Sequence, residues 1–141
     1  MNFKFYIPTR IIFGAGELNN LNKQPMPGKK ALLVISNGKS TRENGYLSRT
    51  EEQLKTAGIS FALFDKVEPN PLKSTVMAGA EMAKKQGCDF VIALGGGSCI
   101  DASKAIAFMA TNPGDYWDYI FGGTGKGKPV QRKPLPIVAI T

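Results

Sequence analysis

Residues 90–101 read FVIALGGGSCID and carry the most specific structural signal in the chain. Phe90–Leu94 is a short, wholly apolar run, which is typical of a strand that is covered on both faces of a parallel sheet. Three glycines follow, and a segment with helical character begins at Ser98. A buried strand, a glycine turn and a helix in this order predict a strand–loop–helix unit of an α/β protein.

The loop of this unit has the chemistry of a phosphate site. Glycine lacks Cβ, so the backbone can turn sharply and a ligand can approach it closely. The amides of the first helical turn then point at the ligand, and the helix dipole favours negative charge there. We therefore predict that Gly95, Gly96, Gly97 and Ser98 bind a phosphate or diphosphate. The alternative is a turn that binds nothing, since the pattern is neither Gly-x-Gly-x-x-Gly nor a Walker loop.

The residues at the helix start carry further predictions. Ser98 is a suitable N-cap, and Ser98 and Asp101 have the spacing of a capping box. Asp101 has a second interpretation, in which it orients a cofactor or substrate group. Cys99 is predicted to be a packing residue rather than a nucleophile, because the chain has no His to activate it.

Strand and helix signals alternate on both sides of this unit. The predicted strands are Ala31–Ser36, Ile59–Phe64, Phe90–Leu94 and Ile137–Ile140. The predicted helices are residues 43–57, 75–86 and 98–110. Segments 54–61 and 83–90 match as a helix end, a glycine and a strand start, and about 30 residues is the length of one βα unit. The fold class is therefore α/β, a doubly wound parallel sheet with helices on both faces.

The amino-terminal residues do not follow this pattern. Phe3, Phe5 and Ile7 alternate with other residues, and the run RIIF at residues 10–13 follows Pro8. This pattern predicts an antiparallel hairpin or edge strand. A short helix is expected from Glu17 to about Asn22.

The loop after the first buried strand bears on the choice of cofactor. In dinucleotide-binding sheets an acidic residue usually binds the adenosine ribose of NAD, and a basic residue accommodates the 2′-phosphate of NADP. Segment 31–42 contains no acidic residue. It does contain two basic residues, Lys39 and Arg42, and several hydroxyl side chains. This favours a phosphate-binding loop, and the alternative is an ordinary polar turn.

Composition excludes several classes of function. The chain has 141 residues, enough for one domain, a net charge of +7 and no His. The basic residues are scattered, so we predict no nucleic-acid partner. No apolar run could span a bilayer, and we predict no membrane association. Without His or a paired Cys motif, no metal site is expected in the chain. Cys88 and Cys99 are interpreted as reduced thiols of a cytoplasmic protein.

Four motifs in register resemble the iron-containing (group III) alcohol dehydrogenase family. They are segment 5–16 (FYIPTRIIFGAG), segment 68–71 (EPNP), segment 93–98 (ALGGGS) with Asp101, and segment 134–141 (PLPIVAIT). The resemblance covers essentially the whole chain and implies the Rossmann-like, dehydroquinate-synthase-like amino-terminal domain of that family. It implies one dinucleotide-binding domain over residues 1–141, with the helical metal domain absent.

The resemblance also implies roles for individual residues. The glycine loop would hold the cofactor diphosphate, Asn70 would lie near the adenosine side, and Thr141 would contact the cofactor at a strand end. Asn37, Gly38, Lys39 and Ser40 fall where the family distinguishes NAD from NADP. The segment resembles the NADPH-dependent, butanol-dehydrogenase-like branch, so NADP is expected in preference to NAD.

The family's activity is hydride transfer between the cofactor and a small primary alcohol or aldehyde. A divalent metal, Fe or Zn, is expected only with the missing domain, so no catalytic residue is predicted in this chain and no activity is expected of it alone. A homo-oligomer, a dimer, is expected. The alternatives are the cofactor domain of a related polyol or sugar-phosphate dehydrogenase, and a nucleotide-binding module without catalysis.

Overall fold

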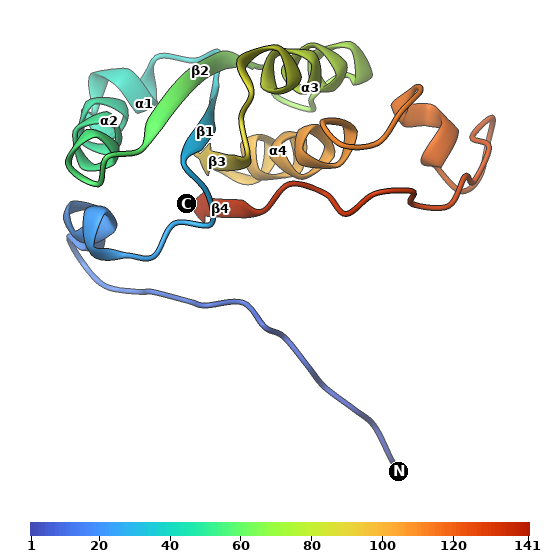
Figure 1. The fold of residues 1–141 in the computed structure, drawn as a ribbon, viewed down its shortest axis with the longest axis horizontal. Coiled ribbons are helices and arrows are strands. Elements are labelled where there is room, and N and C mark those ends of the chain that lie inside the picture. The colour runs from blue at the N-terminus through green and yellow to red at the C-terminus, as the bar shows by residue number, and fades with distance from the viewer.

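A four-stranded parallel sheet forms the centre of the computed structural model, which describes residues 1–141 (Figure 1). The strand order is β2-β1-β3-β4. The strands are β1 (Lys30–Ser36), β2 (Ser60–Val67), β3 (Phe90–Leu94) and β4 (Ile137–Ile140). β1 and β3 occupy the middle and are buried almost throughout, which explains why their sequences are continuous apolar runs. The predicted doubly wound parallel α/β sheet is confirmed.

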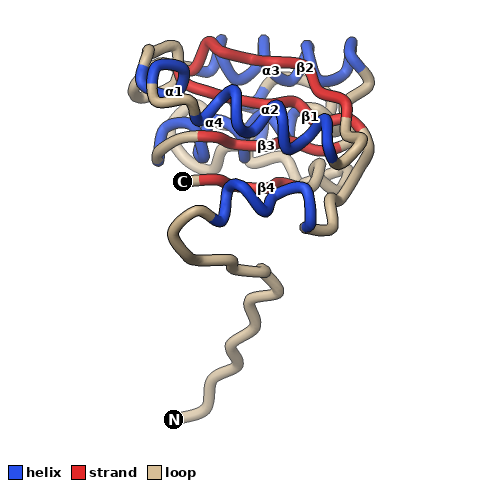
Figure 2. Tube along the Cα trace, turned by 90° about the vertical axis from the view of Figure 1, so that its left-hand side faces the viewer, coloured by secondary structure: helices blue, strands red, loops and turns tan.

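Helices cover both faces of the sheet. The helices are η1 (Glu17–Lys23), α1 (Ser40–Glu43), α2 (Tyr46–Thr56), α3 (Lys73–Gln86), α4 (Gly97–Met109) and η2 (Tyr116–Tyr119). In Figure 1, α1 and α2 lie to the left of the sheet, and α3 and α4 lie to its right. Figure 2 looks onto the α1/α2 side and shows the strands running side by side behind these helices.

The alternation of side chains along β1 divides the core between the two faces. Leu32 and Val34 belong to the cluster under α3 and α4, whereas Leu33 and Ile35 belong to the cluster under α2 and η1. All four side chains are fully buried. Each such side chain stabilises the fold by about 1.5–3 kcal/mol through the burial of apolar surface.

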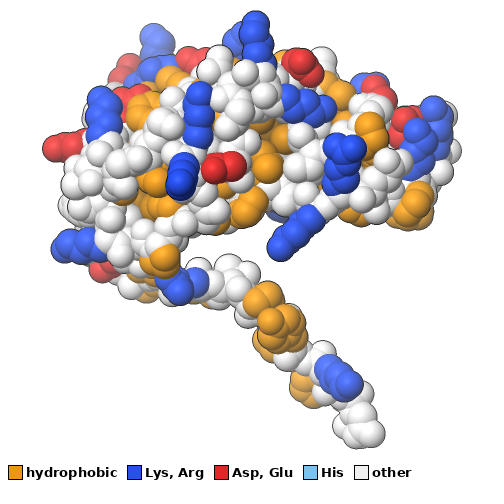
Figure 3. All heavy atoms as spheres, in the orientation of Figure 1, with side chains coloured by type: hydrophobic (Ala, Val, Ile, Leu, Met, Phe, Trp, Pro, Cys, Tyr) orange, Lys and Arg blue, Asp and Glu red, His pale blue; other side chains and the backbone are white.

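The amino-terminal segment corrects the prediction. The structure has no strand in residues 1–16, so the antiparallel hairpin is absent. The segment leaves the body of the molecule as an extended arm (Figure 2), and Figure 3 shows apolar side chains along it. Phe3, Phe5, Ile11 and Phe13 are all at least 77% exposed. An isolated two-stranded hairpin is only marginally stable in water. No neighbouring surface of this chain covers these side chains, so nothing here would stabilise such a hairpin.

Candidate functional site

The carboxyl ends of β1 and β3 lie next to each other, and the chain leaves them in opposite directions. After β1 it passes to α1 and α2 on one face, and after β3 it passes to α4 on the other. In open α/β sheets such a switch point separates two loops and leaves a crevice where ligands bind. The two loops at this switch point are residues 37–40 and residues 95–98, both predicted as cofactor-binding.

The backbone requires glycine at only one of the three glycine positions of the second loop. Gly95 has φ 150°, which other residues rarely adopt, and a Cβ there would lie 3.2 Å from Cys99 Cβ. The N–H of Gly95 donates to the carbonyl of Ile140 at 2.9 Å, so the loop is fixed to β4. At Gly96 and Gly97 a Cβ would meet no atom within 4 Å, and φ is negative at both. The fold therefore requires glycine only at Gly95, and the space beside Gly96 and Gly97 is open.

The first turn of α4 presents free amides to this space. The N-cap is Gly96, which makes no side-chain cap, and the first helical bond runs from the N–H of Ile100 to the carbonyl of Gly96. The N–H groups of Gly97, Ser98 and Cys99 consequently have no backbone acceptor. Amides at a helix start that face open space can bind an anion.

The predicted capping box is wrong. Because α4 begins at Gly97, Ser98 is already the second helical residue and cannot be the N-cap. Asp101 lies on the exposed side of the helix, where its carboxylate pairs with Lys104 at 2.7 Å. Ser40, Gly97 and Ser98 lie at the starts of α1 and α4, next to the loops that follow the strands, whereas Asp101 lies further along α4.

Cys99 fills the space under the loop. Its side chain is buried and its Sγ donates to the carbonyl of Val34 at 3.2 Å. Burial raises the pKa of the Cys99 thiol. The predicted packing role is confirmed, since a protonated, buried thiol is a poor nucleophile.

The loop after β1 is exposed and is tied to the neighbouring strand. The N–H of Asn37 donates to the carbonyl of Val67 at 2.8 Å, and α1 begins at Ser40. Gly38 and Lys39 are exposed, and Lys39 makes no ion pair. One feature of this loop escaped sequence reasoning: Arg42 pairs with Asp65 of β2.

The last two predicted residues also follow strands. Asn70 comes after β2 with φ 53°, the only residue other than glycine in the left-handed region, and is exposed. Glu68 fixes this turn by accepting hydrogen bonds from the N–H of Leu72 at 2.9 Å and the hydroxyl of Thr75 at 2.8 Å. A hydrogen bond from its own backbone N–H, together with these two, lowers the pKa of the Glu68 carboxyl. Thr141 directly follows β4. The carboxyl edge of the sheet therefore collects the predicted residues from four strands.

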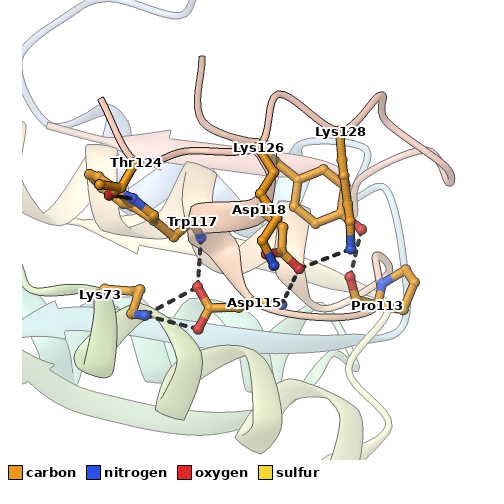
Figure 4. Close-up of polar contacts among 9 residues, drawn as sticks. Lys73, Pro113, Asp115, Trp117, Asp118, Thr124, Lys126 and Lys128 are labelled. Atoms are coloured by element: carbon orange, nitrogen blue, oxygen red, sulfur yellow. Dashed lines mark hydrogen bonds and ion pairs between the residues drawn. The ribbon is translucent and has the colours of Figure 1, made fainter. Parts of the chain in front are cut away.

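A second polar cluster, on the α3/α4 side, is structural (Figure 4). Asp118 accepts from Lys126 at 2.8 Å and from Lys128 at 3.0 Å, which lowers the pKa of its carboxyl. Asp115 caps η2 and pairs with Lys73 at 2.9 Å, so η2 is joined to α3. These contacts hold the glycine-rich segment 122–128 against η2.

A shallow hollow of about 550 Å³ lies apart from the predicted residues. Its lining includes Lys84, Thr111, Arg132 and Lys133, and none of the predicted cofactor-binding residues. The chain has no His, and no three Cys, Asp or Glu side chains gather in a way that could hold a metal ion. None of its helices combines the length and apolarity needed to cross a bilayer.

The fold and the carboxyl edge of the sheet define a doubly wound α/β domain in which a glycine loop and the free amides of a helix start lie at the switch point. Comparisons with known proteins give the family. The iron-containing alcohol dehydrogenase family matches residues 8–141, and the chain belongs to this family.

Relatives with assigned functions agree. A probable NADH-dependent butanol dehydrogenase of Bacillus subtilis (strain 168) is 40% identical over 137 residues, which cover 97% of this chain and 35% of that protein. The 1,3-propanediol dehydrogenase of Citrobacter freundii is 36% identical over 141 residues, which cover 98% of this chain and 35% of that protein. The chain thus spans about a third of the length of the relatives that it matches.

Solved structures match the fold closely. The NADH-dependent butanol dehydrogenase A of Thermotoga maritima has a TM-score of 0.87 at 34% identity, over 98% of this chain and 34% of that one. A sulfoacetaldehyde reductase of Bifidobacterium kashiwanohense, solved in complex with NAD⁺, has a TM-score of 0.79 at 30% identity, over 99% of this chain and 35% of that one.

Proposed function

We propose that this chain is the nicotinamide-dinucleotide-binding part of an alcohol dehydrogenase that uses NADP(H) and a small primary alcohol or aldehyde. The observation that carries the proposal is the open space beside Gly96 and Gly97, directly over the free amides of α4. In this proposal the amides of Gly97 and Ser98 bind the diphosphate. Asn37, Gly38, Lys39, Ser40 and Asn70 line the adenosine side, and Asp101 and Thr141 complete the contacts.

The proposal includes a preference for NADP over NAD. Two of the relatives named above are described as NADH-dependent and a third was solved with NAD⁺, so the argument for NADP comes from this chain's own loop. The loop has no acid between Ala31 and Arg42, and Lys39 is exposed with no carboxylate partner. An unpaired ammonium beside a hydroxyl, that of Ser40, suits a 2′-phosphate better than a 2′-hydroxyl.

The chemistry divides between cofactor and protein. When the dinucleotide is bound, its nicotinamide ring supplies the hydride chemistry. In this proposal the residues of this chain bind and orient the cofactor. We therefore expect the 141-residue chain to bind cofactor without oxidising butanol. Turnover of butanol by the purified chain, with or without added Fe²⁺ or Zn²⁺, would contradict this division.

Isothermal titration calorimetry with NADPH and NADH tests the proposal. We expect both cofactors to bind and NADPH to bind more tightly. Equal or reversed affinities would refute the NADP preference, and heat from neither titration would refute the cofactor site.

Two further expectations belong to the proposal. The exposed apolar arm, residues 1–13, supports self-association into a homodimer, because exposed apolar patches of this kind mark interaction surfaces. Sedimentation velocity should show dimers, and a monomer at tens of micromolar would contradict this. The two free thiols, Cys88 and Cys99, support a reducing, cytoplasmic setting.

A further inference from the structure

A bulge in β2 places an acidic side chain beside the proposed adenosine loop. β1 and β2 pair in register until Val34 lies opposite Phe64, and the pairing resumes with Ser36 opposite Val67. Asp65 and Lys66 therefore lie opposite Ile35 alone, which is the arrangement of a β-bulge. Bulges turn side chains away from the regular alternation, and they occur often next to functional sites.

The bulge directs Asp65 toward α1. Phe64 and Val67 both pack in the core under α3 and α4, and Leu63 packs on the opposite side, under α2. Asp65 follows the same side as Leu63, and its Oδ2 accepts a hydrogen bond from Nη2 of Arg42 in α1. Through this pair an acid of β2 contacts α1, the helix that directly follows the loop beginning at Asn37.

The pair leaves most of the guanidinium available. The Arg42 and Asp65 side chains are 46% and 43% exposed, and only one Arg42 nitrogen is bonded to the carboxylate. A guanidinium has five N–H donors in a planar fork, which matches phosphate oxygens in a bidentate manner. Arg42 lies three residues beyond Lys39 in the chain, so both cations belong to the segment that would surround a 2′-phosphate.

We infer that Asp65 limits the preference for NADPH over NADH by holding Arg42 against β2 and neutralising its charge. This inference rests on the proposed function. Lys39 then supplies the unopposed positive charge, while Arg42, held by Asp65, is not free to bind the 2′-phosphate. Glu43, the only acid within α1, makes no ion pair with Arg42.

Substitution of Asp65 tests the inference in the 141-residue chain. Asp65→Asn should raise the affinity for NADPH by about tenfold, since a freed guanidinium gains charge-assisted bonds to the phosphate and one repulsive charge is removed. The affinity for NADH, which has no 2′-phosphate, should change by less than about twofold. Adenosine 2′,5′-bisphosphate and 5′-AMP, titrated in the same way, restrict the comparison to the ribose end.

Three variants separate this mechanism from a structural role. In the Arg42→Gln background the gain from Asp65→Asn should fall to about threefold or less, the charge effect alone. Glu52→Gln, which removes an exposed acid of α2, should leave the NADPH to NADH ratio unchanged. Thermal unfolding followed by circular dichroism should show that all variants are folded, because exposed ion pairs contribute little to stability.

The outcomes are distinguishable. A wild-type chain that binds neither cofactor overturns the proposed function and this inference together. A wild-type chain that binds NADPH, with an Asp65→Asn variant that binds both cofactors as before, overturns this inference alone. So does a change that is equal for NADPH and NADH, as an anchor between α1 and β2 would produce, or a full tenfold gain without Arg42.

Discussion

Substitution of Gly96 by alanine should leave the fold intact and remove much of the cofactor affinity. Gly96 has φ −77° and ψ −166°, which any residue adopts, and its Cβ would meet no atom within 4 Å. In the free chain Gly96→Ala should therefore change the free energy of unfolding by less than about 1 kcal/mol, because the reduced freedom of the unfolded chain offsets the poorer N-cap. In the complex the methyl group would occupy space that we assign to the diphosphate.

The size of the binding loss follows from the amides involved. Displacing the diphosphate from one or two amides of α4 costs about 1.5–3 kcal/mol for each charge-assisted bond. We therefore expect the Kd for NADPH to rise at least about tenfold, measured by calorimetry. Gly95→Ala is the contrasting variant: its φ of 150° and the 3.2 Å approach to Cys99 Cβ should lower the melting temperature. A Gly96→Ala chain that binds NADPH as tightly as the wild type would refute the reasoning.

Three further predictions concern stability and reactivity. Asn112→Ala should lower the free energy of unfolding by about 2–4 kcal/mol in urea titrations, because the buried amide accepts from two backbone N–H groups and donates to two carbonyls; a loss below 1 kcal/mol would contradict this. The pKa of Asp118 is lowered from 3.8 in the folded chain, so its carboxylate stabilises the fold above about pH 4, and this stabilisation is lost as the pH falls. The melting temperature of Asp118→Asn should therefore depend less on pH below 4 than that of the wild type. Cys99 should react with a thiol reagent more slowly than Cys88, because it is buried whereas Cys88 is half-buried, and equal rates in the folded chain would count against the structure.

The periodicity of the sequence predicted most of the fold. β3 and β4 have the predicted limits, and Gly87 caps α3 with φ 65°. These elements were predictable because their signals are local: an apolar run, a helical spacing and a glycine stop. β2 extends three residues beyond its predicted end, to Val67, since the bulge interrupts the apolar pattern at Asp65 and Lys66.

The errors occurred where the outcome depends on distant parts of the molecule. The alternation of Phe3, Phe5 and Ile7 is a strand pattern, but a strand needs a partner, and no neighbouring element of this chain supplies one. The spacing of Ser98 and Asp101 suits a cap, yet the turn at Gly95 starts α4 one residue earlier.

The positions of the site residues were predictable from the sequence, but the ion pair formed by Arg42 was not. Strand ends predicted the placement of residues 37–40, Asn70 and residues 95–98 at one edge of the sheet. Arg42 looked like a free cation beside Lys39, because the acid that pairs with it lies 23 residues later, on another strand. Only the register of β1 and β2 brings Asp65 to the loop.

Backbone amide chemical shifts of the ¹⁵N-labelled chain, recorded during titration with NADPH, would locate the cofactor site residue by residue. We predict that the largest changes occur at the amides of Gly96, Gly97 and Ser98, with smaller changes at Lys39 and Thr141. Saturable changes confined to the hollow around Lys84 and Arg132, with the glycine loop unmoved, would contradict the assignment of the cofactor site.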